Sequence, residues 1–177
     1  MSSRIDVDEI RSKTTNANLT FQPNGTGLIV PKRTVAFSVE ATDTDQSASA
    51  NNNTLVEWED VRLDTGGYWD STNHRYTPQV AGFYLFGGSI RFAATAGQYV
   101  NAQLRKNTVR QTMVQSNTGS GSEDVFSNGN VPIPTAMVQM NGSTDYVDVV
   151  FGHENAATLH DSSSLPSVFW GVLIHGT

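Results

Sequence analysis

Residues 68–92 read YWDSTNHRYTPQVAGFYLFGGSIRF, a stretch in which aromatic rings alternate with small and polar residues. From Gly82 onward the alternation is strict, so large apolar side chains and two glycines share one face of an extended strand. Pro78 interrupts the pattern because proline has no N–H to donate to a ladder. The stretch therefore predicts two strands, over about 67–76 and 82–94, and the apolar face of the second requires cover from another sheet or another subunit.

The rest of the chain is built from similar short alternating segments, each bounded by Gly, Asn, Ser or Pro. No segment keeps the 3.6-residue apolar period that an amphipathic helix requires. TVAFSVEA predicts a first strand, and a polar surface loop is expected over 42–54. A short strand, LVEWEDV, follows and ends in a turn at 64–67. Further strands are expected in QYVNAQLRKN, VRQTMVQSN, IPTAMVQM, DYVDVVFGH and SVFWGVLIHG. This spacing favours an all-β fold of two packed sheets, a sandwich or jelly roll.

The composition narrows the class of protein. A net charge of −6 disfavours a nucleic-acid partner, and no run of about 18 apolar residues is present to insert into a membrane. The chain has no cysteine, which excludes thiol catalysis and suits synthesis in a reducing cytoplasm. The first residues, MSSRIDVDEIRSK, lack the apolar core of a secretory signal.

Two parts of the chain are expected from its length of 177 residues. Residues 1–32 are polar and include NLTFQPNGTGLIVP, which predicts a β-hairpin or ribbon too short to bury its own apolar face. We expect these residues to form an extended attachment arm and residues 33–177 to form the sandwich domain.

The spacing of the rings resembles that of the globular head domain of complement C1q, in the C1q and tumour necrosis factor superfamily. The resemblance rests on Trp58, Asp64, Trp69 and Tyr76, followed by Gly82-Phe-Tyr-Leu-Phe86, and every gap matches the family signature. Gly88 departs from it, because the family usually has an aromatic residue there. TVAFSVEA, LRKNTV, AMVQMNGSTDYVDVVF and FWGVLI also resemble family segments, so the similarity covers about residues 33–175.

The resemblance implies a ten-stranded antiparallel jelly roll that assembles as a homotrimer and binds ligands rather than catalysing a reaction. Five aromatic residues are expected in the core or at the trimer interface: Trp58, Tyr84, Phe86, Phe92 and Phe169. Trp69 and His74 are the candidates for ligand contact, since an exposed ring beside the polar STNH segment could stack on a sugar.

The sequence supports metal binding and catalysis less than it supports ligand binding. His74, His153, His160 and His175 lack the spacing of a zinc site. No cofactor is expected, although calcium stays open through Asp43, Asp45, Asp145 and Asp148, because oxygen ligands are common on surfaces. No nucleophile elbow or phosphate-binding loop is present, so an enzyme is not expected.

The N-terminal segment IDVDEIRSKTTNANLTFQPNGTG resembles segments that recur in phage tail fibres and other virion appendages. The resemblance implies a bacteriophage structural protein, made in the host cytoplasm and displayed on the virion surface as a tail-fibre tip, knob or capsid decoration. Residues 1–32 would bind other virion proteins, and the head would bind a host-surface glycan or stabilise the particle. A cellular C1q-like adhesion or signalling domain and a carbohydrate-active enzyme are the alternatives.

Overall fold

A computed structural model gives the fold of the chain. It describes residues 34–42, 45–93, 99–117, 129–154, 157–159 and 166–177. The chain divides into two units, Met1–Lys32 and Arg33–Thr177, and the hairpin expected in the first unit lies outside the described residues. Every described residue belongs to the second unit.

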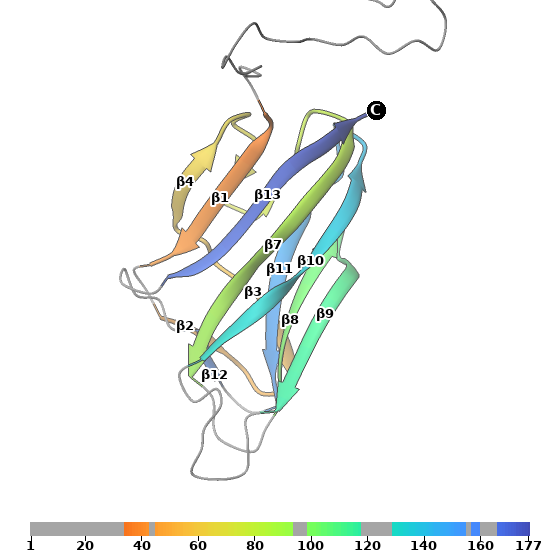
Figure 1. Ribbon diagram of the computed structural model, residues 1–177. Helices are drawn as coiled ribbons and strands as arrows, with labels where there is room; N and C mark the ends of the chain where they lie inside the picture. Colours follow the sequence, from red (N-terminus) through yellow and green to blue (C-terminus); the bar gives the residue numbers. More distant parts are fainter. Residues whose placement is uncertain (1–33, 43–44, 94–98, 118–128, 155–156, 160–165) are drawn as a thin grey trace, which may run out of the picture. The chain divides into compact units, whose positions relative to one another are not determined.

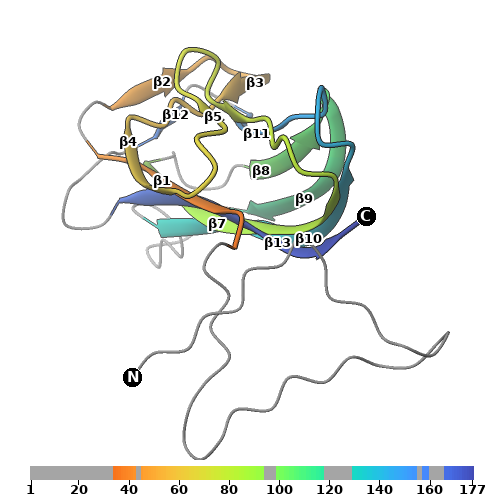
Figure 2. The same ribbon diagram turned by 90° about the horizontal axis from the view of Figure 1, so that it is seen from above.

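Every described element is a β-strand, and the strands form two antiparallel sheets that lie against each other as layers (Figures 1 and 2). The first sheet has the order β2 (Gln46–Ala48), β12 (Ala157–Leu159), β7 (Gly82–Ala93), β13 (Ser167–Gly176), β1 (Ala36–Ala41) and β4 (Asp60–Asp64), and β10 (Gly129–Met140) also pairs with β7. The second has the order β5 (Trp69–Asp70), β6 (Arg75–Tyr76), β11 (Val147–His153), β8 (Tyr99–Lys106) and β9 (Val109–Asn117), and β3 (Asn52–Leu55) also pairs with β11.

The expected all-β class is confirmed, and the strict alternation after Gly82 forms one continuous strand, β7. Three local predictions were wrong. The strand expected over 67–76 is a hairpin of β5 and β6 with a turn at residues 71–74, and the loop expected over 42–54 contains β2 and most of β3. In the LVEWEDV segment, Trp58 lies between β3 and β4 rather than inside a strand.

The core fills the space between the two layers. Strand β1 alternates between half-buried and buried residues, and its buried Phe37 and Val39 point inward, as their period of two predicts. Phe37 lies 4.0 Å from Tyr76 of the opposite sheet, measured between ring centroids, and 5.0 Å from Phe169. Because these rings come from both sheets, their packing joins the layers.

Candidate functional site

The aromatic residues expected in the core or at a subunit interface lie in the core of the single chain. Trp58, Tyr84, Phe86 and Phe169 are each at most 1% exposed. Trp58 stacks on Phe169 at 5.8 Å, and Tyr84 stacks on Phe86 at 5.9 Å. The side chain of Phe92 lies outside the described residues. One chain already buries the four described rings, so contacts between subunits would have to use other side chains.

Trp69 and His74, the residues expected to contact a ligand, belong to the β5–β6 hairpin and its turn. Both are half-buried, and Trp69 stacks on Phe37 with 5.6 Å between ring centroids. His74 has a φ of 48° and places Nδ1 3.2 Å from the backbone nitrogen of Trp58. These contacts attach the hairpin to the core, and a role in ligand binding stays a prediction.

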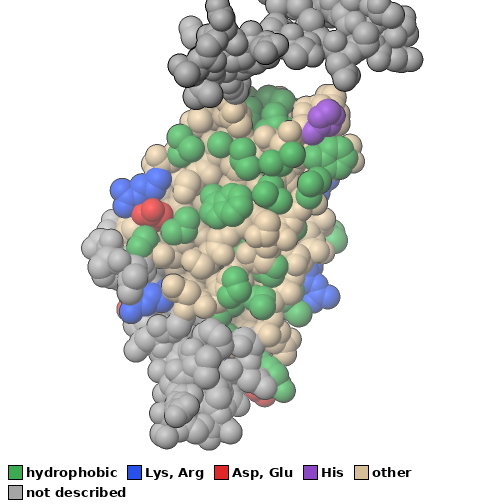
Figure 3. Space-filling view, viewed as in Figure 1, with side chains coloured by type: hydrophobic (Ala, Val, Ile, Leu, Met, Phe, Trp, Pro, Cys, Tyr) green, Lys and Arg blue, Asp and Glu red, His purple; other side chains and the backbone are tan. Residues whose placement is uncertain are grey.

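The outer face of the first sheet carries a group of apolar side chains. Residues directly opposite each other on neighbouring strands share a face, and one row across four strands is Ala36, Val172, Leu85 and Met137. Figure 3 looks onto this sheet and shows hydrophobic side chains spread over its middle, with charged groups at its margins. We define the Trp170 face by these four residues together with Leu63, Phe83, Val168 and Trp170.

Trp170 lies on this face opposite a glycine of the neighbouring strand. It pairs with Gly87 of β7, and a Cβ at position 87 would lie 2.8 Å from Cζ2 of the Trp170 ring. The missing side chain therefore leaves room for the indole to lie against the sheet. Trp170 is half-buried, while Leu63 and Met137 are 46% and 61% exposed. Apolar side chains gathered in this way are typical of an interaction surface.

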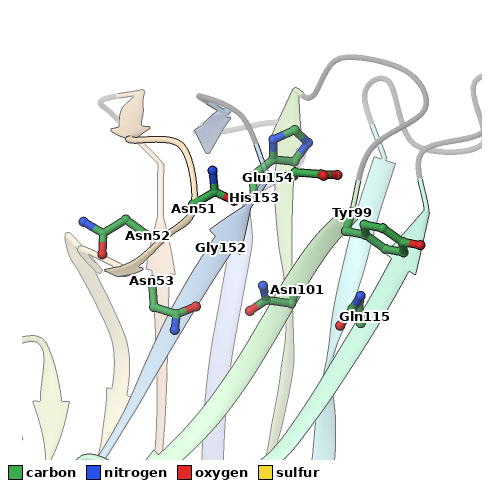
Figure 4. A pocket seen from close by; sticks show the side chains of 9 residues that line it. All are labelled: Asn51, Asn52, Asn53, Tyr99, Asn101, Gln115, Gly152, His153 and Glu154. Carbon is green, nitrogen blue, oxygen red and sulfur yellow. The ribbon is translucent and has the colours of Figure 1, made fainter.

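The outer face of the second sheet carries a pocket of about 300 Å³ with a mostly polar lining, at the His153 end of β11. A row of directly opposite residues crosses four strands: Asn53 on β3, Gly152 on β11, Asn101 on β8 and Gln115 on β9. Figure 4 shows these side chains with the other residues that line the pocket. We call it the amide pocket, and its lining is Asn51, Asn52, Asn53, Tyr99, Asn101, Gln115, Gly152, His153 and Glu154.

The floor of the amide pocket depends on Gly152 and on Gln103. A Cβ at position 152 would lie 2.6 Å from Asn53 Oδ1 and 2.8 Å from Asn101 Nδ2, so a larger residue there would displace one of the two amides. Gln103 is 8% exposed, and its Nε2 donates to Asn53 Oδ1 at 2.9 Å and to Asn101 Oδ1 at 2.8 Å. This site was not predicted from the sequence, because its residues are spread over segments that only the sheet register brings together.

The carboxylates considered for calcium form other contacts where they are described. Asp148 accepts two hydrogen bonds from Arg105, at 2.7 and 2.8 Å. Burial acts to raise the pKa of Asp145, but hydrogen bonds from Lys106 and Asn107 outweigh it and leave that pKa lowered. Within the described ranges, no group of three or more His, Asp or Glu side chains could hold a metal ion. Asp43 and His160 lie outside those ranges.

The two-layer architecture defines a jelly-roll protein, and comparison with known proteins identifies its family. The C1q domain family matches residues 36–174, so the chain belongs to the C1q domain family. The expected ten strands correspond to thirteen strand segments in the described residues, of which five are two to four residues long. The expectation of a C1q-like jelly roll is confirmed.

Solved structures show the same fold. The globular domain of zebrafish complement 1qA protein matches with a TM-score of 0.57 at 18% identity, covering 82% of this chain and 100% of that one. Eiger TNF from S. frugiperda gives 0.57 at 12% identity and covers 80% and 92%. Murine APRIL gives 0.58 at 11% identity and covers 80% and 100%. No curated protein matches the chain.

Membrane insertion was not expected from the sequence. In the part of the chain that the structure describes, no helix is long and apolar enough to span a bilayer.

Proposed function

We propose that the chain is a non-enzymatic structural protein of a bacteriophage virion, whose C1q-like domain forms a homotrimeric head on the particle surface. The main support for a trimer is the Trp170 face, where Val172, Leu85 and Met137 lie in one row near Trp170. Exposed apolar area of this kind is stabilised by burial against a like surface. Membership of the C1q domain family supports the same mode of assembly.

The virion setting rests on the sequence. The N-terminal segment resembles those of phage tail fibres, and the absence of cysteine suits a protein that is released by lysis. Residues 1–32 would attach the head to other virion proteins, and the head would contribute to attachment to a host-surface glycan or to particle stability. Weak sites repeated in each trimer would bind through avidity.

Sedimentation velocity of the full chain at micromolar concentration tests the assembly. We expect a species of three times the 19.2 kDa chain mass. Trp170→Glu should shift the protein to monomers, because assembly would bury an unpaired carboxylate at a cost of several kcal/mol. Gln111→Glu adds the same charge at an exposed position of β9 and should leave the trimer intact. A monomeric wild-type chain, or an intact Trp170→Glu trimer with native circular dichroism, contradicts the assembly.

Immunogold labelling of purified phage particles, with antibodies to residues 34–177, tests the virion role. We expect label on the particles, and we expect particles assembled with a chain lacking residues 1–32 to lose it.

A cellular C1q-like adhesion or signalling domain is the second candidate, because the three solved structures named above come from animals. Immunogold label on the surface of uninfected cells, together with phage particles that carry no label, would support this cellular role and refute the virion role.

A further inference from the structure

The amide pocket has the chemistry of a site for a neutral, hydroxyl-rich ligand. We propose that it binds a neutral carbohydrate, with Asn53, Asn101 and Gln115 hydrogen-bonding the hydroxyl groups and Tyr99 packing against a sugar ring. The proposal deepens the attachment role and rests on the proposed function for the source of the sugar. The preference for a neutral sugar follows from the pocket's own side chains and is independent of that role.

The hydrogen-bonding capacity of the pocket is arranged before any ligand arrives. Gln103 Nε2 donates both of its hydrogens, one to Asn53 Oδ1 and one to Asn101 Oδ1. Each of those amides therefore keeps its own NH₂ group as a donor, and no described residue accepts from Asn53 Nδ2 or Asn101 Nδ2. Because Gln103 is buried and holds both amides in place, little side-chain entropy remains to be lost on binding.

Amide groups match the dual character of a sugar hydroxyl. A carboxamide offers two donors and an acceptor, while a hydroxyl both donates and accepts. An apolar ligand would leave these amides without partners, at a cost of about 1–3 kcal/mol for each buried group. The row of polar side chains therefore selects a polar ligand.

The charge of the lining selects against an anion. None of the nine lining residues is Lys or Arg, and Glu154 adds a carboxylate at the rim. The chain as a whole carries a net charge of −6. A phosphate or an acidic sugar would meet repulsion without a compensating cation. An extended peptide is also disfavoured, since it would bind at a sheet edge and this pocket lies on a sheet face.

Tyr99 supplies the apolar contact that a sugar ring needs. It lies two residues before Asn101 on β8, so both side chains project from the same face of the sheet. Its side chain is 47% exposed, and its backbone carbonyl accepts from the N–H of Glu154 at 3.2 Å, which fixes its position. A tyrosine offers a rigid amphipathic surface with two rotatable bonds. The volume of about 300 Å³ lies at the lower end for ligand pockets, which suits a small saccharide unit.

Saturation-transfer difference NMR on the full chain tests the proposal. The probes are D-glucose, D-galactose, D-mannose, L-rhamnose and N-acetyl-D-glucosamine, with D-glucuronate and N-acetylneuraminate as anionic comparisons. We expect transfer to at least one neutral sugar. Tyr99→Ala, Asn101→Ala and Gln115→Ala should each weaken that binding by about fivefold or more, as expected for the loss of about 1 kcal/mol. Gln111→Ala, on the same strand as Gln115 but outside the lining, should bind like the wild type.

Tyr99 and Gln115 are exposed, so their variants should fold and report on sugar binding even if Asn101→Ala disturbs folding. No transfer to any neutral sugar, transfer to the anionic sugars alone, or unchanged binding by the Tyr99 and Gln115 variants overturns the proposal. Sedimentation of the same samples separates the two proposals. An intact trimer without sugar binding refutes only the carbohydrate site, whereas a monomer that binds sugar through this pocket refutes only the assembly.

Discussion

Single glycines set how closely neighbouring strands of the first sheet can approach each other. A Cβ at Gly82 would collide with the carbonyl oxygen of His175, on the neighbouring strand β13. A Cβ at Gly176, the residue paired with Gly82, would contact only the carbonyl oxygen of Ala81, at 3.9 Å. The two glycines are therefore neighbours with opposite tolerance for a side chain.

We expect Gly82→Val to lower the free energy of unfolding by about 2–4 kcal/mol, because backbone atoms of β13 would have to move. Gly176→Val is the matched control and should cost less than about 1 kcal/mol. Urea denaturation of both variants measures the difference. Equal urea midpoints for Gly82→Val and Gly176→Val would show that the close approach of β13 to Gly82 does not affect the free energy of unfolding.

Tyr84 gives the fold a sensitivity to alkali. Burial, aided by the nearby Tyr68, raises the pKa of Tyr84 to about 12 from an ordinary value of 10.0, and its hydroxyl donates to the carbonyl of Val80 at 2.9 Å. Burial also raises the pKa of Tyr76. A group whose pKa is raised in the folded state contributes stability below pH 10, and that contribution is lost as the pH rises toward about 12.

Tyr84→Phe should therefore lower stability by about 1 kcal/mol at neutral pH, through the lost hydrogen bond. Between about pH 10 and 12, the fall in unfolding free energy should be shallower than in the wild type, since one of the two shifted tyrosines no longer titrates. Urea midpoints across this range measure the slope. Parallel curves for wild type and variant would contradict the assignment to Tyr84.

At the scale of elements, sequence patterns predicted strands where one side of the segment is buried. The period-two pattern of Tyr84, Phe86 and Ile90 located β7, because those side chains are buried and alternate with half-buried neighbours. Strand β3, in contrast, has the sequence NNTL and pairs with β11 through its backbone. Its polar side chains show no alternation of apolar residues, so the sequence pattern predicts a loop there.

The hairpin of β5 and β6 was missed for a different reason. Asp64 accepts hydrogen bonds from the backbone N–H groups of Gly67 and Trp69, at 2.9 and 2.8 Å, and Asp70 accepts from those of Thr72 and Asn73. The Asp70 turn divides a segment that is rich in aromatic rings and otherwise resembles one strand. The amide pocket needs the register of four strands at once, and no local pattern in the sequence contains that information.

At the scale of the whole domain, the two outer faces differ in chemistry. The Trp170 face is apolar, with Leu85 and Met137 in register on neighbouring strands, whereas the second sheet presents Asp148 bound to Arg105 beside the amides of Gln103 and Asn101. This asymmetry is what a subunit needs in order to hide one side in an assembly and keep the other in water.

The position of Gly152 on the sheet opposite to the Trp170 face has a consequence for how the protein can change. Substitutions at Asn53, Asn101 or Gln115 would change the hydrogen-bonding groups of the amide pocket and leave the contacts of Trp170 untouched. In the proposed trimer, the ligand preference of the amide pocket could therefore change by substitution while the subunit contacts are kept, provided that glycine stays at position 152.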